Sequence, residues 1–393
     1  MANNNKHAGP NVPALRFPEF SGEWEQCQIK DFGKVITGST PPTSKTEYYD
    51  NGVFLWASPA DLGNVKDVVS TKTKLSQQGF DKCRKIPAHS ILVTCIGSTI
   101  GKMGMATTEM ATNQQINSII PIDCSPDYVY YSIQSRFPKY ITSIATQAVP
   151  ILSKSVFESL DSYKTSIEEQ NKIGKLLHLL DERIDAQSKI IEELTTLRSA
   201  LIEKCAKQTG NYFSLSDILE EVEERSTTAN QYQVLSSTVK GIFSQKEYFN
   251  KDIASEDNKG YKVVRKGHIV LSPQNLWMGN INYNDRFDIG IVSPSYKVFS
   301  IKEGFNPTFI AALLQTKKAL NEYMLASEQG ASIVRRNLNI EAFMAIKFRI
   351  PDARQQDSLS LAITAINAKL NNERCYLEQL TMQKSCLLEN MFI

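Results

Sequence analysis

The sequence lacks most patterns that mark a membrane or secreted protein. It has no run of about 18 apolar residues, and its first ten residues, MANNNKHAGP, contain no apolar segment of the signal-peptide kind. Its seven cysteines are scattered without a CxxC pair, and its four histidines form no cluster. Neither a disulfide framework nor a zinc site is predicted. We therefore expect a cytoplasmic protein with reduced thiols and no membrane contact.

Catalytic signatures are also missing. The segment at 97–103, GSTIGKM, has one residue too few between its glycines for a phosphate-binding P-loop, and Met103 stands where that loop needs a hydroxyl. The segment at 40–43, TPPT, lacks both the first and the last residue of the NPPY or DPPY tetrapeptide of adenine methyltransferases. No HExxH, GxSxG or Cys/His metal spacing occurs. The sequence predicts no active site, metal or cofactor of its own.

The composition is that of an ordinary globular protein. Hydrophobic residues make up 41% of the 393 residues and charged residues 22%, which suits two or more domains with their own cores. The 44 Lys and Arg residues are nearly balanced by 42 Asp and Glu residues, leaving a net charge of +2. A surface for nucleic acid would therefore need local clustering of basic residues.

Residues 166–208 carry the strongest periodic pattern. Apolar side chains recur mostly at alternating steps of four and three residues, which is typical of a helix in a coiled coil. Such a helix would be a rod of about 60 Å. Its predicted seam consists of Ile173, Leu177, Leu180, Ile184, Ile191, Leu194, Leu197 and Leu201.

This segment has a second copy at 351–393, in which every seam position except Leu197 recurs at an offset of 186. Even the polar break repeats, because Gln187 falls on Glu373. The pattern predicts that the two helices pair as an intramolecular antiparallel coiled coil; the alternative is two amphipathic helices packed on separate cores. The second seam consists of Leu359, Ile363, Ile366, Leu370, Leu377, Leu380 and Leu387.

The segments before the two helices also repeat. The apolar stretches at 90–94 and 268–272 align at an offset of 178, and each precedes a loop that ends in glycine. Further matches pair 29–38 with 215–224, 95–104 with 273–280 and 148–157 with 330–339, and further strands are expected at 116–122 and 291–299. We predict an α+β chain with two similar mixed α/β domains, 1–165 (with a disordered tail at 1–12) and 209–350, separated by spacer helices at 166–208 and 351–393.

This organisation resembles the specificity subunit of type I restriction-modification systems. The resemblance covers essentially the whole chain, although the usual PPLxEQ lead into each helix is degraded to KTSIEEQ and RIPDARQQ. That departure weakens the motif but leaves the architecture. The matching motifs are LRFPEF at 15–20 with Trp24, the GxxxGKMG-like loop at 97–104, EEQNKI at 168–173, RQQDSL at 354–359, and LTTLRSAL at 194–201 with its echo LTMQKSCL at 380–387.

The resemblance implies a non-catalytic DNA-binding role. Each domain would be a target-recognition domain that reads one half of a bipartite, asymmetric site in double-stranded DNA, and the coiled coil would set the spacing. Two methyltransferase (modification) subunits, which bind S-adenosylmethionine, would dock on the chain. A restriction endonuclease/translocase subunit, which uses ATP and Mg, would complete the complex.

Candidate DNA contacts are polar residues in the predicted loops. Asn and Gln side chains can pair with adenine in the major groove, whereas Lys, Ser and Thr more often contact phosphates. A polar strand entry or a solvated loop is the alternative in each case. In the first domain the candidates are Asn113, Gln114 and Gln115 for bases, and Ser39, Thr40, Lys45, Thr99 and Lys102 for phosphates.

The second domain offers two groups of candidates. Gln274, Asn275 and Trp277 combine amides with an aromatic ring, which would either pack on a base or sugar or fill the core. Arg335 and Arg336 can fork onto phosphate or guanine. Two other functions stay open: a restriction or modification enzyme with an unrecognised active site, and a coiled-coil adaptor with no role on DNA.

Overall fold

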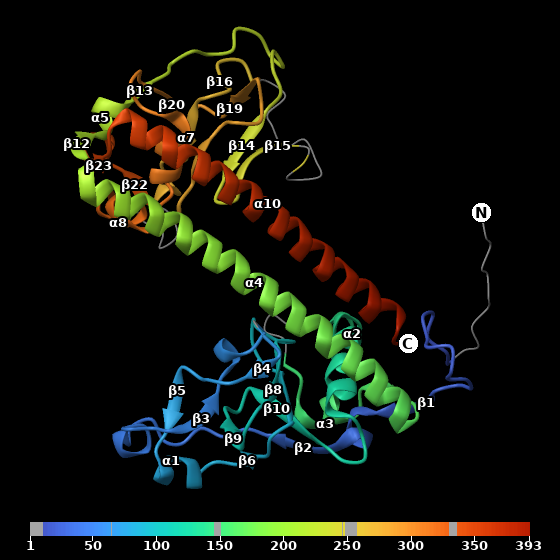
Figure 1. The fold of residues 1–393 in the computed structure, drawn as a ribbon. Helices are drawn as coiled ribbons and strands as arrows, with labels where there is room; N and C mark the ends of the chain where they lie inside the picture. Colours follow the sequence, from blue (N-terminus) through green and yellow to red (C-terminus); the bar gives the residue numbers. More distant parts are fainter. Residues whose placement is uncertain (1–10, 64, 145–150, 246, 248–257, 330–335) are drawn as a thin grey trace, which may run out of the picture. The chain divides into compact units, whose positions relative to one another are not determined.

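The computed structural model describes residues 11–63, 65–144, 151–245, 247, 258–329 and 336–393 (Figure 1). The expected tail at 1–12 therefore lies almost wholly outside the described residues. The chain divides into two compact units: unit 1 comprises residues 1–189 and 375–393, and unit 2 comprises residues 190–374. Each unit holds one mixed α/β domain and one segment of each long helix, α4 (Ile167–Thr209) and α10 (Ala353–Asn390).

Unit 1 is built on two small sheets. The central sheet has the order β2 (Gly33–Thr37), β10 (Ile116–Pro121), β7 (Ile91–Thr94), β8 (Met103–Ala106) and β4 (Asp67–Val68). The second sheet has the order β5 (Thr73–Leu75), β3 (Phe54–Ala57), β9 (Met110–Thr112) and β6 (Lys85–Ile86). A separate antiparallel pair joins β1 (Glu25–Gln28) to β11 (Asp161–Lys164). The remaining elements are η1 (Ile29–Phe32), η2 (Thr46–Tyr48), η3 (Pro59–Asp61), α1 (Gln77–Asp81), α2 (Pro126–Ile144) and α3 (Lys154–Glu158).

Unit 2 repeats this plan. Its four-stranded sheet has the order β13 (Leu219–Glu221), β20 (Lys297–Ile301), β17 (Ile269–Leu271) and β18 (Ile281–Tyr283). Antiparallel pairs join β12 (Asn211–Ser214) to β23 (Lys347–Ile350), β14 (Leu235–Thr238) to β15 (Gly241–Ser244), β16 (Lys262–Arg265) to β19 (Ile289–Val292), and β21 (Ser327–Gln329) to β22 (Arg336–Leu338). The helical elements are α5 (Leu215–Ile218), η4 (Leu276–Met278), α7 (Pro307–Leu313), α8 (Lys317–Leu325) and α9 (Ile340–Ala345).

The internal repeat is visible in strand order as well as in sequence. The order β2-β10-β7-β8 corresponds to β13-β20-β17-β18, and the pair β1·β11 corresponds to β12·β23. Several equivalent elements begin at the offset found in the sequence: β1 at 25 and β12 at 211, β11 at 161 and β23 at 347, α4 at 167 and α10 at 353. Both copies also place a capping box after the first strand, closed by Asp31 in η1 and by Asp217 in α5. Two domains of one topology therefore follow from one duplicated sequence.

One expected strand is wrong. The stretch at 291–299 was expected to be continuous, but it contains the end of β19 and the start of β20, which belong to different sheets. The chain turns between them at residues 293–296, where Pro294 has no backbone N–H for a strand ladder. By contrast, the strands expected near 90–94, 116–122 and 268–272 are present as β7, β10 and β17.

Within each unit the segments of α4 and α10 run antiparallel. In unit 1, Asp181 pairs with Lys384 at 2.5 Å, and Ile173 and Leu177 share a core with the end of α10. In unit 2, Arg198 donates a hydrogen bond to Asn367 at 2.8 Å. The expectation of an α+β chain with an antiparallel helix pair is confirmed. Both helix segments also enter the cores of their domains, so the helices pack against strands as well as against each other.

The predicted seam is largely the buried face of the helices. Leu197 is an exception, because it is 55% exposed while Ile202 is fully buried. An α-helix drifts relative to a strict seven-residue repeat, so the inward-facing position moves by a residue after several turns. Of the seam residues, Ile173, Leu177, Leu180, Leu359, Ile363, Leu370 and Leu380 are buried, and Ile184, Ile191, Leu194, Leu201, Ile366, Leu377 and Leu387 are half-buried. Among the described residues, no helix is long and apolar enough to cross a membrane.

Candidate nucleic-acid interface

In unit 1 three polar segments meet at one end of the central sheet. The loop after β2, the turn before β10 and the loop after β7 come together because neighbouring strands run antiparallel. Thr40 Oγ1 donates a hydrogen bond to Gln114 Oε1. Gln115 Nε2 donates to the carbonyl oxygen of Ile96 at 3.4 Å. The fold therefore gathers residues that are far apart in the sequence into one polar surface.

Two of the predicted contacts in this surface instead shape the loops. Asn113 is 8% exposed, its Oδ1 accepts from the backbone N–H of Gln115 at 2.9 Å, and its Nδ2 donates to Gln115 Oε1 at 3.0 Å. The hydroxyl of Ser39 accepts from the backbone N–H of Arg84 at 3.0 Å, and its carbonyl accepts from Trp56 Nε1 at 3.0 Å. Thr40 and Gln114 remain exposed, so they are the residues of this group that could reach a ligand.

The three other candidates of unit 1 make contacts of their own. Lys45 is exposed and donates a hydrogen bond to the Tyr48 hydroxyl at 3.4 Å, which raises the pKa of Lys45. Lys102 and Thr99 are half-buried in the loop after β7, where the backbone N–H of Lys102 donates to Thr99 at 3.1 Å. Lys102 also lines a cavity of about 780 Å³ between this loop and helices α2, α4 and α10.

In unit 2 the candidates form a compact cluster. The guanidinium of Arg336 lies 5.6 Å from the ring centre of Trp277, and the backbone N–H of Arg336 donates to the carbonyl of Gln274 at 3.4 Å. Arg336 also donates to the carbonyl of Met324 at 3.3 Å. Trp277 is half-buried beneath this arginine, and its buried Nε1 has no hydrogen-bond partner among the described residues. Gln274 is exposed.

Asn275 and Arg335 complete the candidates of unit 2. The backbone carbonyl of Asn275 accepts from the N–H groups of Met278 and Asn280 at 3.1 and 3.3 Å, so this residue shapes the turn of η4. Arg335 lies outside the described residues. The same holds for residues 148–150 and 330–335 of the predicted correspondence between 148–157 and 330–339.

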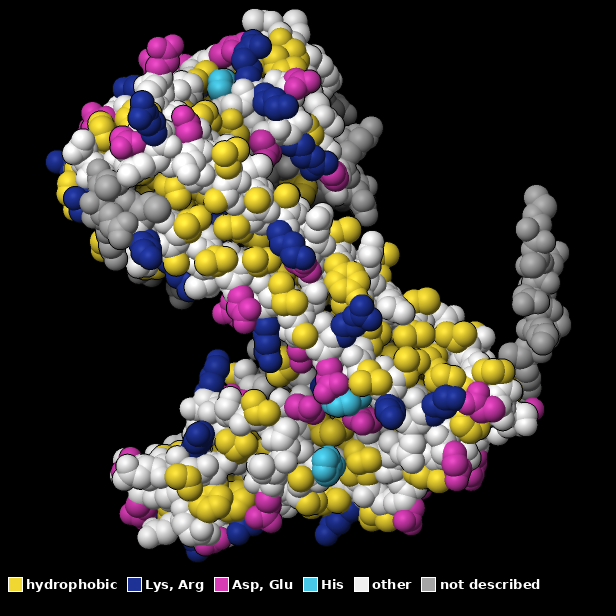
Figure 2. Space-filling view, viewed as in Figure 1, with side chains coloured by type: hydrophobic (Ala, Val, Ile, Leu, Met, Phe, Trp, Pro, Cys, Tyr) yellow, Lys and Arg dark blue, Asp and Glu magenta, His cyan; other side chains and the backbone are white. Residues whose placement is uncertain are grey.

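The candidate loops occupy equivalent places in the two repeats. The loop between β7 and β8 forms a bridge from Ile96 to Ile151, a residue shortly before helix α3. In the loop between β17 and β18, the backbone carbonyl of Gln274 accepts a hydrogen bond from the backbone N–H of Arg336, a residue shortly before helix α9. The scaffold is thus repeated while the polar side chains on it differ. On the face shown in Figure 2, basic and acidic side chains are interspersed, as the small net charge indicates.

Two features of the structure were not found from the sequence. One is the β14–β15 hairpin of unit 2, which rests on buried Asn280 and Asn282; the asparagine at every second position from 280 to 284 was its available signal. The other is a buried charged cluster beside the cavity of unit 1. There Lys66 donates to Asp127 at 2.7 Å, and the Tyr131 hydroxyl donates to Asp181 at 2.7 Å. Burial and the Asp181 carboxylate raise the pKa of Tyr131.

No metal centre is indicated in the part of the chain that the structure describes, where no three His, Cys, Asp or Glu side chains are grouped to hold an ion. Residues 21–196 match the family described as "Type I restriction modification DNA specificity domain". This segment of the chain is similar to the DNA specificity domain of type I restriction-modification systems. The match covers unit 1 and the start of the helix pair, and the repeated topology extends the same plan to unit 2.

The curated relatives that this chain matches are specificity subunits of type I restriction enzymes. The specificity subunit of the type I restriction enzyme HindI from Haemophilus influenzae is 33% identical over 185 residues, 46% of this chain and 40% of that protein. The MjaIX specificity subunit from Methanocaldococcus jannaschii is 30% identical over 182 residues, 44% of this chain and 42% of that protein. The chain thus spans about two fifths of the length of these curated relatives.

Solved structures of this family share the fold along nearly the whole chain. The type I restriction-modification S subunit from M. genitalium matches 97% of this chain and 99% of its own, with a TM-score of 0.59 and 16% identity. A structure described as the basis of assembly and conformational transition of the type I system matches 94% of this chain and 97% of its own, with a TM-score of 0.50 and 11% identity. At these identities the likeness concerns the fold.

Proposed function

We propose that the chain is the non-catalytic specificity subunit of a type I restriction-modification complex in the cytoplasm. Each domain would read one half of a bipartite, asymmetric site in double-stranded DNA. One observation carries the proposal: the two domains repeat the same strand order, yet the equivalent loops β7–β8 and β17–β18 carry different side chains, Thr99 and Lys102 in the first and Gln274 and Trp277 in the second. A duplicated scaffold with two different sets of loop residues is what reading two different half-sites requires.

The helix pair would set the distance between the half-sites and dock the partners. Two methyltransferase subunits would bind equivalent surfaces of the two repeats, because an internal duplication presents similar surfaces twice. They would supply S-adenosylmethionine and the transfer chemistry. A restriction endonuclease/translocase subunit would add ATP- and Mg-dependent cleavage. The residues of this chain would bind and orient the DNA.

Reconstitution tests this function. The chain is assayed for DNA binding and adenine methylation alone and with an adenine methyltransferase subunit, at two salt concentrations. We expect methylation of a bipartite site by the complex and none by the chain alone. Methylation or cleavage by the chain alone would identify an enzyme. A stable complex that fails to bind DNA would identify an adaptor.

Substitution of the exposed candidates then assigns the half-sites. Gln114→Ala should alter base preference in one half-site, and Gln274→Ala should alter it in the other. Arg335→Ala with Arg336→Ala should weaken binding and reduce its salt dependence. An unchanged salt dependence in a folded variant removes the two arginines from the interface. Exposed Gln78→Ala, in helix α1, is the control.

A further inference from the structure

The β14–β15 hairpin of unit 2 presents an unusual pair of residues at its tip. Val239, 60% exposed, and Lys240, also exposed, form the two-residue connection between the strands. The turn is closed by its own hydrogen bonds, because the backbone N–H of Lys240 donates to Thr238 Oγ1 at 3.0 Å. Gly241 follows with φ of +132°, a conformation that favours glycine.

Buried amides hold this hairpin in place from below. Ser237 Oγ donates to Asn280 Oδ1 at 2.7 Å, and Asn280 Nδ2 donates back to the carbonyl of Ser237 at 2.9 Å. Asn282 Nδ2 donates to the carbonyl of Thr238 at 2.7 Å. All three anchoring side chains, those of Ser237, Asn280 and Asn282, are buried. A satisfied buried network of this kind rigidifies the segment that it holds.

The hairpin belongs to the same end of the domain as the candidate loop of unit 2. Asn280 closes the loop between β17 and β18, which carries Gln274 and Trp277, and it also anchors Ser237 at the end of β14. Figure 1 shows β14 and β15 side by side within unit 2.

Unit 1 differs at the equivalent position. Its strands β3 and β5 match β14 and β15 in pairing, but residues 58–72 connect them and contribute β4 to the central sheet. In unit 2 the connection is reduced to the exposed tip. Of the two strand pairs, the described residues show a two-residue tip with an exposed valine and lysine in unit 2 alone.

We propose that the Val239–Lys240 tip enters the major groove of DNA and reads part of one half-site. A two-stranded β-ribbon fits the major groove, where apolar side chains contact the thymine methyl group and lysine reaches guanine or a phosphate. This inference rests on the proposed function. It identifies the hairpin tip as a part of unit 2 that contacts the bases. Val239 would favour a T·A pair, and Lys240 would add affinity that depends on salt.

The test uses the full chain in complex with its methyltransferase subunit and a set of duplexes that vary one base pair at a time. Val239→Ala should lower discrimination at one or two positions of a single half-site about tenfold. Lys240→Gln should reduce the salt slope of binding by about one. Both residues are exposed, so the variants should keep the circular dichroism spectrum of the native protein. Leu325→Ala and Lys266→Gln, at exposed positions of the same unit, are the controls.

The outcomes separate this inference from the function on which it rests. Native base preference and salt slope in both tip variants would overturn the hairpin assignment and leave the proposed function intact. Weaker binding of the methyltransferase with unchanged base preference would also overturn it, since the tip would then contact a protein. Failure of the native complex to bind any bipartite duplex would overturn the proposed function itself.

Discussion

Gln170 Oε1 accepts a hydrogen bond from the backbone N–H of Ser125 at 3.1 Å, which ties the start of α4 to the start of α2. Its Nε2 donates to the carbonyl of Thr165 at 2.8 Å. Gln356, its equivalent in the second copy, makes the same two bonds to Asn306 at 2.8 Å and to Pro351 at 2.9 Å. Both glutamines are 3% exposed. The glutamine at this position of both repeats therefore has a structural role, because it joins each long helix to the domain that precedes it.

Removal of either glutamine should weaken its own unit. Gln170→Leu leaves the N–H of Ser125 and the carbonyl of Thr165 without partners, which should lower the free energy of unfolding of unit 1 by about 1–3 kcal/mol. Gln356→Leu should do the same in unit 2. Urea denaturation, with hydrogen exchange to assign the unit, measures the effect. Gln383→Leu, exposed on α10, is the control, and an equal loss in that variant would argue against the hydrogen bonds as the cause.

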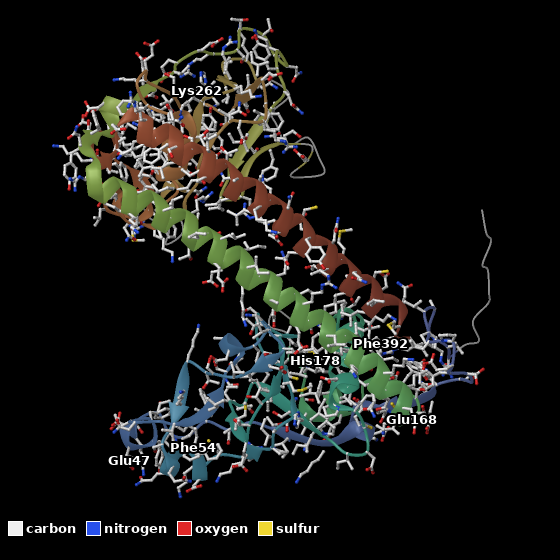
Figure 3. The ribbon with its side chains drawn as sticks, viewed as in Figure 1. Glu47, Phe54, Glu168, His178, Lys262 and Phe392 are labelled. Carbon is white, nitrogen blue, oxygen red and sulfur yellow. The ribbon has the colours of Figure 1, made fainter. Side chains whose placement is uncertain are left out.

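The residues that follow α10 contribute an aromatic side chain to the core of unit 1. Phe392, labelled in Figure 3, packs with its ring centre 6.3 Å from that of Trp24 and 5.6 Å from that of Tyr128. Phe392→Ala should cost about 3–5 kcal/mol, because it opens a cavity in the core. Thermal unfolding followed by near-ultraviolet circular dichroism reports the loss. Met382→Ala, 71% exposed on α10, should leave the midpoint unchanged, and an unaltered midpoint in Phe392→Ala would show that the Phe392 side chain does not stabilise the core.

The repeat made much of this fold predictable, since it relates distant segments without any knowledge of contacts. A seven-residue pattern that recurs in two parts of the chain predicts two paired helices, and the structure has both. Leu197 and the stretch at 291–299 show the limit. The inward-facing position of a long helix moves gradually around the helix, and a chain can turn from one sheet into another. Both depend on packing, which the periodicity of the sequence alone does not encode.

The candidate interface was less accessible to sequence reasoning. Residue type suggested Asn113 as a base contact, but the structure uses its amide to close a turn. The Val239–Lys240 tip carries no motif, and its rigidity comes from Asn280 and Asn282, about 40 residues away in the sequence. Exposure and hydrogen-bond use are properties of the folded chain, so residue type alone could not rank these positions.

Asp185 should make unit 1 less stable as the pH rises. Burial, followed by the nearby Asp181 carboxylate, raises the pKa of Asp185, while Lys189 and Lys384 act in the opposite direction and Asp67 adds to the rise. A carboxyl with a raised pKa in the folded state contributes stability that is present below its unfolded pKa of about 3.9 and is lost as the pH rises through the folded value.

Asp185→Asn therefore should raise the thermal midpoint at pH 7.5. Solvent screens this partly buried group, so the gain should be at most about 2 °C. It should shrink as the pH is lowered towards 4, because the native carboxyl is then protonated as well. Scanning calorimetry at several pH values measures it, with Glu193→Gln, exposed on the same helix, as the control. A gain that is independent of pH would point to packing instead of charge.

The helix pair offers the sharpest test of the proposed spacing role. Asp181 and Arg198 are 17 residues apart on α4, and their partners Lys384 and Asn367 are 17 residues apart on α10 (198−181 = 384−367 = 17). Deletion of residues 184–190 together with 370–376 removes seven residues between these pairs on both helices and keeps both pairs in register. Deletion of 184–190 alone shifts one helix against the other and is the matched control.

The double deletion should shorten the gap of the recognised site by about three base pairs, because seven helical residues span about 10 Å and base pairs are stacked about 3.4 Å apart. Because the deletion removes a full heptad, the side chains on either side of it keep their directions around the helix axis to within about 20°. Half-site sequences should stay the same, since the reading loops are untouched. Methylation of duplexes with gaps of different length gives the answer. A folded double-deletion complex that keeps the native gap would mean that the helices do not set the spacing, and the partner subunits would then have to fix it.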